Sequence, residues 1–426
     1  MGAHHHPGST AEPPRRLRFV VGLIAAAAFV ASLGAAAWWW PGDVEGVRGL
    51  AAEQLDARVA AVNDCPADQA AFDERGEPVP CSVLSVELLE GVDLGQTFDL
   101  PAIYDQRDAF EVGETLAVNK IEAEEAPFAY SFADRRRGTA LVVLAGLFAG
   151  AVVALGRLRG LLALAGLALV SAVLLVFTLP ALVNGTDPLG VAVVSAALIT
   201  FAALYPAHGF NAMTTTAVLG TLGALAVTVG LGQLFVTAGS FSGFTTEEAF
   251  WLDAASGSID VRGLLLAGLV LGALGALDDM TVTQASVVFE LRAADPTMSR
   301  ARLFASAMKV GRDHVASTVN TLFLAYAGAS LPLLLLLVLG GLPLADSLNS
   351  EIIATEVVRT LVGSIGLVVS VPLTTWLAVA VLPAGGAVAA AAASTPETEP
   401  GGVRADADGP QEPRSLRDRL RAELEA

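Results

Sequence analysis

Two adjacent aspartates, Asp278 and Asp279, interrupt a long apolar segment that begins at Val261. Carboxyl groups are costly near the hydrocarbon of a membrane, so each one there needs a structural or functional reason. Adjacent carboxylates in a medium of low dielectric constant cannot both ionise easily, and one of them is expected to keep its proton. The pair is therefore a candidate cation or proton site. The structural alternative is that the span ends at Leu277 and that water hydrates both carboxylates.

A helix that continues past this pair carries a polar face, because Asp279 and Thr283 recur one turn apart and Ser286 and Glu290 follow on the same side. Asp278 lies about 26 Å along a helix that starts at Val261, at a rise of about 1.5 Å per residue. This depth corresponds to the inner edge of the hydrocarbon core. The candidate transport or ion-binding residues are Asp278, Asp279, Thr283, Gln284 and Asn320.

Asn320 belongs to a second polar group, which lies between Gly311 and Thr321 at the start of a later span. Serine and threonine can bond their own helix backbone, but an asparagine in a span is expected to meet a polar partner on another helix. Asp313 and His314 in the same group are secondary candidates. His208 is a third, although a lone histidine in a turn is more often a solvated loop residue than a proton carrier.

Motifs of common enzymes are missing from the sequence: it contains no HExxH, no GxSxG and no Walker A string. An aspartyl dyad needs carboxylates from two separate elements, and only Asp313 could face Asp279 in that way. We therefore expect no enzymatic activity, no cofactor and no bound metal. A net charge of −18 excludes proteins that bind nucleic acid by neutralising phosphates.

The elements that must position these residues are membrane helices. Of the 426 residues, 54% are hydrophobic and only 16% are charged, whereas soluble domains carry about a quarter charged residues. A helix needs about 20 apolar residues to cross a bilayer. Eight segments meet this requirement, which predicts an all-α polytopic membrane bundle of about eight helices. They are Phe19–Trp40, Gly138–Gly156, Leu161–Val183, Leu189–Tyr205, Met213–Val236, Val261–Leu277, Ala316–Gly340 and Val357–Leu382.

Flanking cations predict the orientation of these spans. Arg15, Arg16 and Arg18 precede the first span, which ends in three tryptophans typical of a membrane interface. We interpret this span as an uncleaved anchor with the N-terminus inside, a cleaved signal peptide being the alternative. The arginines at 135–137 contradict the rule, but they end a long translocated segment, where charge counts predict poorly. The prediction is a cytoplasmic-membrane protein with both termini inside.

The insert between the first two spans is strongly acidic: Asp43 to Asp134 holds 21 Asp or Glu and five Lys or Arg. A solvated surface is the simplest explanation of this charge. The insert also contains both cysteines of the chain, Cys65 and Cys81. In an oxidising compartment the two are expected to form a disulfide, and two unpaired thiols are the alternative.

Short β-prone runs near Ser82–Leu89 and Phe110–Val118 predict a small β-rich extracytoplasmic domain, entered through a helix at Val47–Val62. Pairs of glycines four residues apart, Gly146/Gly150 and Gly268/Gly272, indicate close helix packing. The predicted domains are a cytoplasmic tail (1–18), an anchor (19–40), an acidic extracytoplasmic domain (41–137), a seven-helix membrane domain (138–382) and a disordered cytoplasmic tail (383–426) with a short helix at Leu416–Glu425.

Two stretches of sequence carry a family resemblance, together with the predicted layout of one anchor, an external β-rich insert and seven further spans. The stretches are GALGALDDMTVTQASVVFEL, from Gly272 to Leu291, and GRDHVASTVNTLFLAYAGASLPLLL, from Gly311 to Leu335. Over roughly Asp99 to Leu382 the chain resembles the YibE/F-like family of multi-pass membrane proteins. The resemblance implies an integral membrane protein described loosely as a permease, without a settled substrate or mechanism.

The leading hypothesis is a membrane permease or export component that uses an inner vestibule lined by Asp278, Asp279, Thr283 and Gln284. Its expected partners are the lipid bilayer and an unidentified small solute or cation. The competing hypothesis is a scaffold that does not transport, in which the membrane helices anchor the acidic domain and that domain binds an envelope protein. Both hypotheses exclude nucleic acid as a partner.

Overall fold

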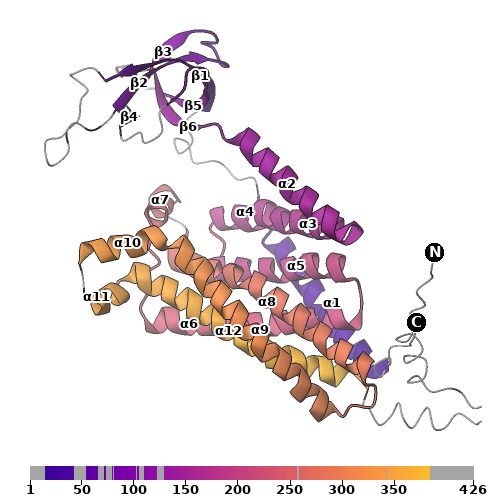
Figure 1. Cartoon of the computed structure of the whole chain (residues 1–426). Helices are drawn as coiled ribbons and strands as arrows, with labels where there is room; N and C mark the ends of the chain where they lie inside the picture. The colour runs from indigo at the N-terminus through magenta and orange to yellow at the C-terminus, as the bar shows by residue number, and fades with distance from the viewer. Residues whose placement is uncertain are drawn as a thin grey trace, which may run out of the picture.

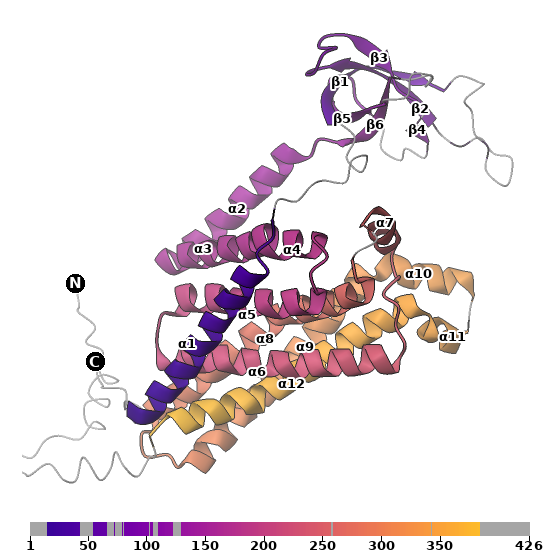
Figure 2. The same ribbon diagram turned by 180° about the vertical axis from the view of Figure 1, so that it is seen from behind.

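The computed structural model describes residues 15–42, 54–65, 72, 79, 81–101, 103–104, 110–121, 129–256, 259–341 and 343–383. Most of this chain is helical, and a small β-sheet lies at one end of the helices (Figures 1 and 2). The predicted terminal tails, including the helix expected at Leu416–Glu425, lie almost entirely outside the described residues.

The helices follow the long apolar blocks of the sequence. They are α1 (Arg15–Trp38), α2 (Gly138–Gly156), α3 (Leu158–Ala172), the π-helical segment η1 (Val173–Thr178), α4 (Leu179–Val183), α5 (Pro188–His208), α6 (Ala212–Ala238), α7 (Glu247–Ser256), α8 (Val261–Ala294), α9 (Arg300–Ala329), α10 (Leu331–Gly340), α11 (Leu344–Asn349) and α12 (Glu351–Val381). In the described chain seven runs of helix have the length and composition of a membrane span, or eight if the bent pair α9–α10 is one span. The predicted number of long apolar helices is thereby confirmed.

Helices α9 and α10 meet at an angle of 64°. Pro332 is the second residue of α10, and proline lacks the N–H that would continue the hydrogen bonding of α9. The run from α3 through η1 to α4 continues instead as one apolar segment, Leu158–Val183. Its π-helical turns are tied to α5 by Thr178, whose hydroxyl lies 2.7 Å from that of Ser195.

The sheet after α1 contains β1 (Gln54–Asp64), β2 (Cys81–Leu88), β3 (Thr97–Asp99), β4 (Ile103–Tyr104), β5 (Thr115–Lys120) and β6 (Tyr130–Arg135). Neighbouring strands are antiparallel in the order β3-β2-β1-β5-β6, and β4 also pairs with β2. The predicted β-rich fold of the insert is confirmed. The helix predicted at Val47–Val62 is wrong from Gln54 onward, since Gln54–Asp64 is the central strand, and residues 47–53 lie outside the described residues.

Alternate residues of β1, namely Leu55, Ala57 and Val59, enter a core shared with β2, β5 and β6. A disulfide joins Cys65, just after β1, to Cys81, the first residue of β2, with their Cα atoms 5.8 Å apart. The crosslink fixes the ends of the connection between two paired strands. The sheet thus has its own apolar core and its own covalent crosslink.

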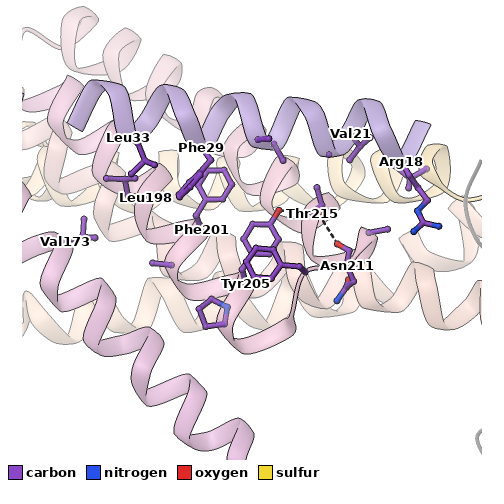
Figure 3. Close-up of a pocket in the computed structure, with 18 residues that line it drawn as sticks. Arg18, Val21, Phe29, Leu33, Val173, Leu198, Phe201, Tyr205, Asn211 and Thr215 are labelled. Carbon is purple, nitrogen blue, oxygen red and sulfur yellow. Dashed lines mark hydrogen bonds between the residues drawn. The ribbon is translucent and has the colours of Figure 1, made fainter. Parts of the chain in front are cut away.

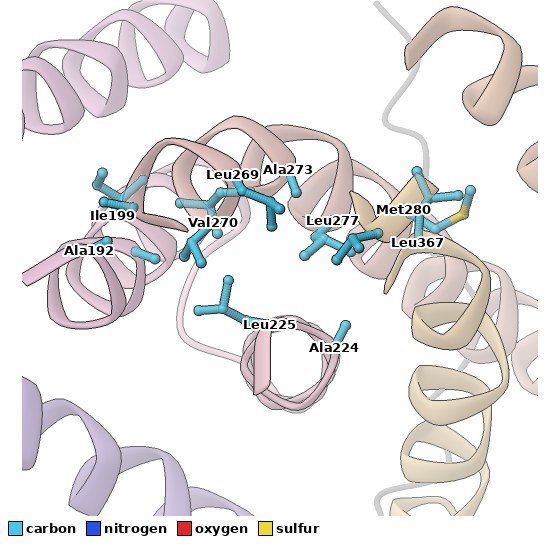
Figure 4. Packing of buried hydrophobic residues seen from close by; sticks show 14 of the residues in the cluster. Ala192, Ile199, Ala224, Leu225, Leu269, Val270, Ala273, Leu277, Met280 and Leu367 are labelled. Atoms are coloured by element: carbon cyan, nitrogen blue, oxygen red, sulfur yellow. The ribbon is translucent and has the colours of Figure 1, made fainter. Parts of the chain in front are cut away.

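Helix α8 occupies the centre of the bundle, where it contacts α5, α6, α9 and α12. Figure 4 shows the main apolar cluster around it, with Ile199 from α5, Leu225 from α6, Leu277 from α8 and Leu367 from α12. Because α8 is enclosed by four helices, any polar side chain on its packed faces must be accommodated by a neighbouring helix.

Helices α6 and α12 cross closely through two glycine–threonine contacts. A Cβ at Gly220 would collide with the side chain of Thr374, and a Cβ at Gly366 would collide with that of Thr228. Of the four glycines paired in the sequence, Gly272 alone packs closely, because a Cβ there would lie 2.9 Å from the Tyr326 hydroxyl oxygen of α9. Positions Gly146 and Gly150 have nothing within 4 Å of a Cβ, and the nearest atom to a Cβ at Gly268 is an Arg359 nitrogen, 4.0 Å away.

Candidate functional site

Helix α8 passes through the aspartate pair without a break and ends only at Ala294. The span therefore does not stop at Leu277, and Asp278 lies near the middle of a helix enclosed by others. Its side chain is buried, at 8% exposure. The Thr200 hydroxyl of α5 donates a hydrogen bond of 3.3 Å to the Asp278 carboxyl group, and Thr221 of α6 interacts with the same group.

Threonine hydroxyls extend this contact into a small polar network between α6 and α8. The hydroxyls of Thr221 and Thr281 are 2.6 Å apart, and that of Thr281 donates to the backbone carbonyl of Asp278 over 3.1 Å. None of the ion pairs in the described chain involves Asp278. A buried carboxyl group with hydroxyl neighbours and no ion-pair partner has a charged form that is costly to keep in this position.

Asp279 lies on a different face of α8, because successive residues of an α-helix are rotated by about 100°. Its side chain is exposed, and that of Thr283, one turn further on, is half-buried. Gly275, one turn before Asp279, has open space where a Cβ would be. The structure therefore separates the two neighbouring carboxyl groups: Asp278 faces α5 and α6, whereas Asp279 lies on an open face.

Gln284 is also buried, but its side chain is held by hydrogen bonds to two other helices. Its amide nitrogen donates a hydrogen bond of 2.7 Å to the Thr375 hydroxyl of α12 and one of 3.1 Å to the carbonyl of Ala307 in α9. A Cβ at Gly311 would lie 2.7 Å from the Gln284 side-chain oxygen. Gln284 thus joins α8 to α9 and α12, on a different side of α8 from the partners of Asp278.

The remaining predicted residues do not join Asp278. Asn320, Asp313 and His208 have exposed side chains, and His314 is half-buried. At His208 and His314 the described hydrogen bonds involve the backbone carbonyl, which accepts from Asn211 and Thr318 respectively. The single vestibule expected from the sequence is thus not formed by these side chains.

The turn between α8 and α9 is held by Arg292, which is 3% exposed. Its guanidinium donates a hydrogen bond of 3.1 Å to the carbonyl of Pro296 and one of 2.6 Å to that of Met298. In the same turn the hydroxyl and backbone N–H of Thr297 donate to the Asp295 carboxylate and hold the pKa of that group below its usual range. These contacts fix how α9 leaves α8.

Sequence reasoning missed an ion pair within α12. The Arg359 guanidinium donates a hydrogen bond of 2.7 Å to the Glu356 carboxylate, and both side chains are about a quarter exposed. Tyr326 of α9 lies near both charges, and its hydroxyl oxygen is 2.9 Å from where a Cβ at Gly272 would be. The signal was present, because Arg359 is a cation within the predicted span Val357–Leu382.

Breaking this pair tests whether it is desolvated. We expect Glu356→Gln to lower the free energy of unfolding by about 1–2 kcal/mol, because the guanidinium keeps its burial and loses its charged acceptor. The double variant Glu356→Gln/Arg359→Gln should recover most of that loss. Thermal unfolding of the purified protein in detergent measures both. A double variant less stable than the single one would contradict this account.

A family model described as YibE/F-like protein matches residues 144–384, which is more than half of the chain. The chain belongs to the YibE/F-like family. The matched region extends from α2 to the end of α12 and so contains Asp278, Gln284 and the Glu356–Arg359 pair of this YibE/F-like protein. No match was found among curated proteins or among solved structures.

The YibE/F-like region contains, in its described residues, no group of three or more His, Cys, Asp or Glu side chains placed to hold a metal ion. Its chemistry is instead that of single polar groups surrounded by apolar helices. Asp278 is the most enclosed carboxyl group among them, so it is the residue on which a functional proposal can be built.

Proposed function

We propose that this YibE/F-like protein is a membrane permease or export component in which Asp278 takes up and releases a coupling proton or small cation. The observation that carries the proposal is the burial of Asp278 between α5, α6 and α8 with threonine hydroxyls as neighbours. An ionisable group in this position is expensive and is typical of a transport pathway.

We also propose that the protein lies in the cytoplasmic membrane, with both ends of its helical region on the inner side. Arg18 at the start of α1 and Val381 at the end of α12 line the same pocket, which supports the placement of both ends at one face. The sheet lies toward the opposite end of the helices in Figures 1 and 2, in keeping with an external domain.

Ion flux tests the proposal directly. The full chain is reconstituted in liposomes, and inward gradients of H⁺, Na⁺, K⁺ or Mg²⁺ are imposed under a clamped membrane potential, each followed by an entrapped dye that responds to that ion. We expect movement of H⁺ or of one of these cations at least about tenfold faster than in liposomes without protein.

The scaffold hypothesis predicts a different result, since a membrane anchor moves no ion. Flux equal to that of empty liposomes for all four ions would overturn the permease proposal. Binding of an envelope protein that depends on the external sheet, and that survives changes at Asp278, would then support the scaffold. Because the sheet has its own apolar core, a variant that lacks the sheet can be compared with the full chain in this binding experiment.

A further inference from the structure

A pocket of about 770 Å³ lies between α1, α5 and the start of α6. Figure 3 shows that α1 forms one wall, from Arg18 to Leu33, and that Leu198, Phe201 and Tyr205 of α5 face it. The walls are mostly apolar. This volume is within the range of sites that bind drug-sized or lipid-sized molecules.

Aromatic rings form a ladder along this pocket. The rings of Phe29 and Phe201 meet edge to face with centroids 5.0 Å apart, and Tyr205 stacks on Phe210 at 4.6 Å. Phe210 is 89% exposed. A large aromatic side chain left this open at the edge of an apolar pocket offers a surface for an apolar occupant.

The polar groups of the pocket gather at one end. Arg18, Asn211 and Thr215 lie together there, away from Leu33 (Figure 3). Asn211 caps α6, a helix of 27 residues, so the partial positive charge of this helix terminus adds to the charge of Arg18. The end of the pocket where α1 begins is therefore electropositive, and the other end is apolar.

The length of the pocket matches one leaflet of a bilayer. From Val21 to Leu33 the apolar wall of α1 extends about 18 Å at a rise of about 1.5 Å per residue. Half of the hydrocarbon core is about 15 Å thick. A molecule with an anionic head and an apolar chain of one-leaflet length fits both the polarity and the dimensions.

We infer that the pocket between α1 and α5 binds an anionic glycerophospholipid of the bilayer, with the phosphate beside Arg18 and the start of α6 and an acyl chain along the aromatic ladder. The site does not depend on the proposed transport role. One side of α5 lines the pocket through Phe201, whereas Thr200, the preceding residue, faces Asp278 in α8.

Lipid titration of the purified full chain in detergent, followed by native mass spectrometry, tests the inference. Phosphatidylglycerol and phosphatidylcholine are the probes. We expect phosphatidylglycerol to bind about fivefold more tightly, the ratio expected for about 1 kcal/mol from one interfacial cation. Arg18→Gln should remove this preference, and Arg159→Gln, an exposed arginine outside the pocket, should keep it.

Filling the pocket is the second arm of the test. Ala26→Trp places an indole within it and should weaken phosphatidylglycerol binding at least about tenfold, whereas Ile24→Trp, on the same helix but outside the pocket, should change it less than about twofold. Gly22→Leu, where a Cβ would meet nothing within 4 Å, provides a second filling variant if Ala26→Trp does not fold.

Three results would overturn the inference. The first is equal binding of the two lipids by the unchanged protein, and the second is unchanged phosphatidylglycerol binding in a folded pocket-filling variant. The third is a change of oligomeric mass in that variant without loss of lipid, which would assign the pocket to a second copy of the chain. Ion flux through Asp278 is measured separately, so failure of either proposal leaves the other testable.

Discussion

Asp278→Asn is expected to lower proton or cation flux at least roughly 100-fold while the protein remains folded. Loss of a group that transfers protons typically has an effect of this size. Asparagine has nearly the same shape as aspartate and still accepts the hydrogen bond from Thr200, but it cannot ionise. Flux in liposomes and thermal unfolding in detergent, measured on the same preparation, separate loss of function from loss of structure.

The matched control is Asp279→Asn, which removes the same charge from the neighbouring residue. Asp279 is exposed and lies on another face of α8, so flux should change less than about twofold. Asp278→Glu should retain part of the activity, because it keeps a carboxyl group in the same packed environment. Equal flux in the two Asn variants, whether both are active or both inactive, would contradict the special role of Asp278.

The long apolar helices could be predicted, because the thickness of a bilayer sets the length of apolar block that a span requires. An apolar block read as Leu189–Tyr205 corresponds to α5, Pro188–His208, and one read as Met213–Val236 corresponds to α6, Ala212–Ala238. For these two helices the differences are a few residues at the ends, and Asn211 caps α6 just before its first residue.

The roles of the two aspartates could not be separated from sequence. Helix α8 is contacted by four other helices, so its apolar residues do not form one stripe that would orient it. The partner that distinguishes Asp278 is Thr200, which is 78 residues away in the chain. Contacts at this separation depend on how the helices pack, and a single sequence carries no record of that packing.

Strand β1 was misread as part of a helix for a related reason. The segment is rich in alanine, which favours helix, and the alternation of Leu55, Ala57 and Val59 is weak because the middle residue is small. Pairing with β2 on one side and β5 on the other decides its conformation. Tertiary pairing thus overrides a modest local preference.

Tight packing of α6 on α12 leads to the second large effect, which is on stability. We expect Gly366→Ala to lower the free energy of unfolding by about 2 kcal/mol, because the new methyl group collides with the Thr228 side chain of α6. Gly220→Ala, at the other end of the same crossing, should cost about as much through Thr374. Thermal unfolding in detergent of the single and double variants measures these losses.

The sign of the effect identifies its cause, since glycine-to-alanine changes within helices otherwise stabilise by up to about 1 kcal/mol. Gly230→Ala in α6, with nothing within 4 Å of its Cβ, should therefore be neutral or stabilising. Thr228→Ala removes the hydroxyl that obstructs position 366, so Gly366→Ala/Thr228→Ala should regain more than half of the loss. If Gly366→Ala matched Gly230→Ala, or if the threonine change restored nothing, the close crossing of α6 and α12 could not be what holds these two helices together.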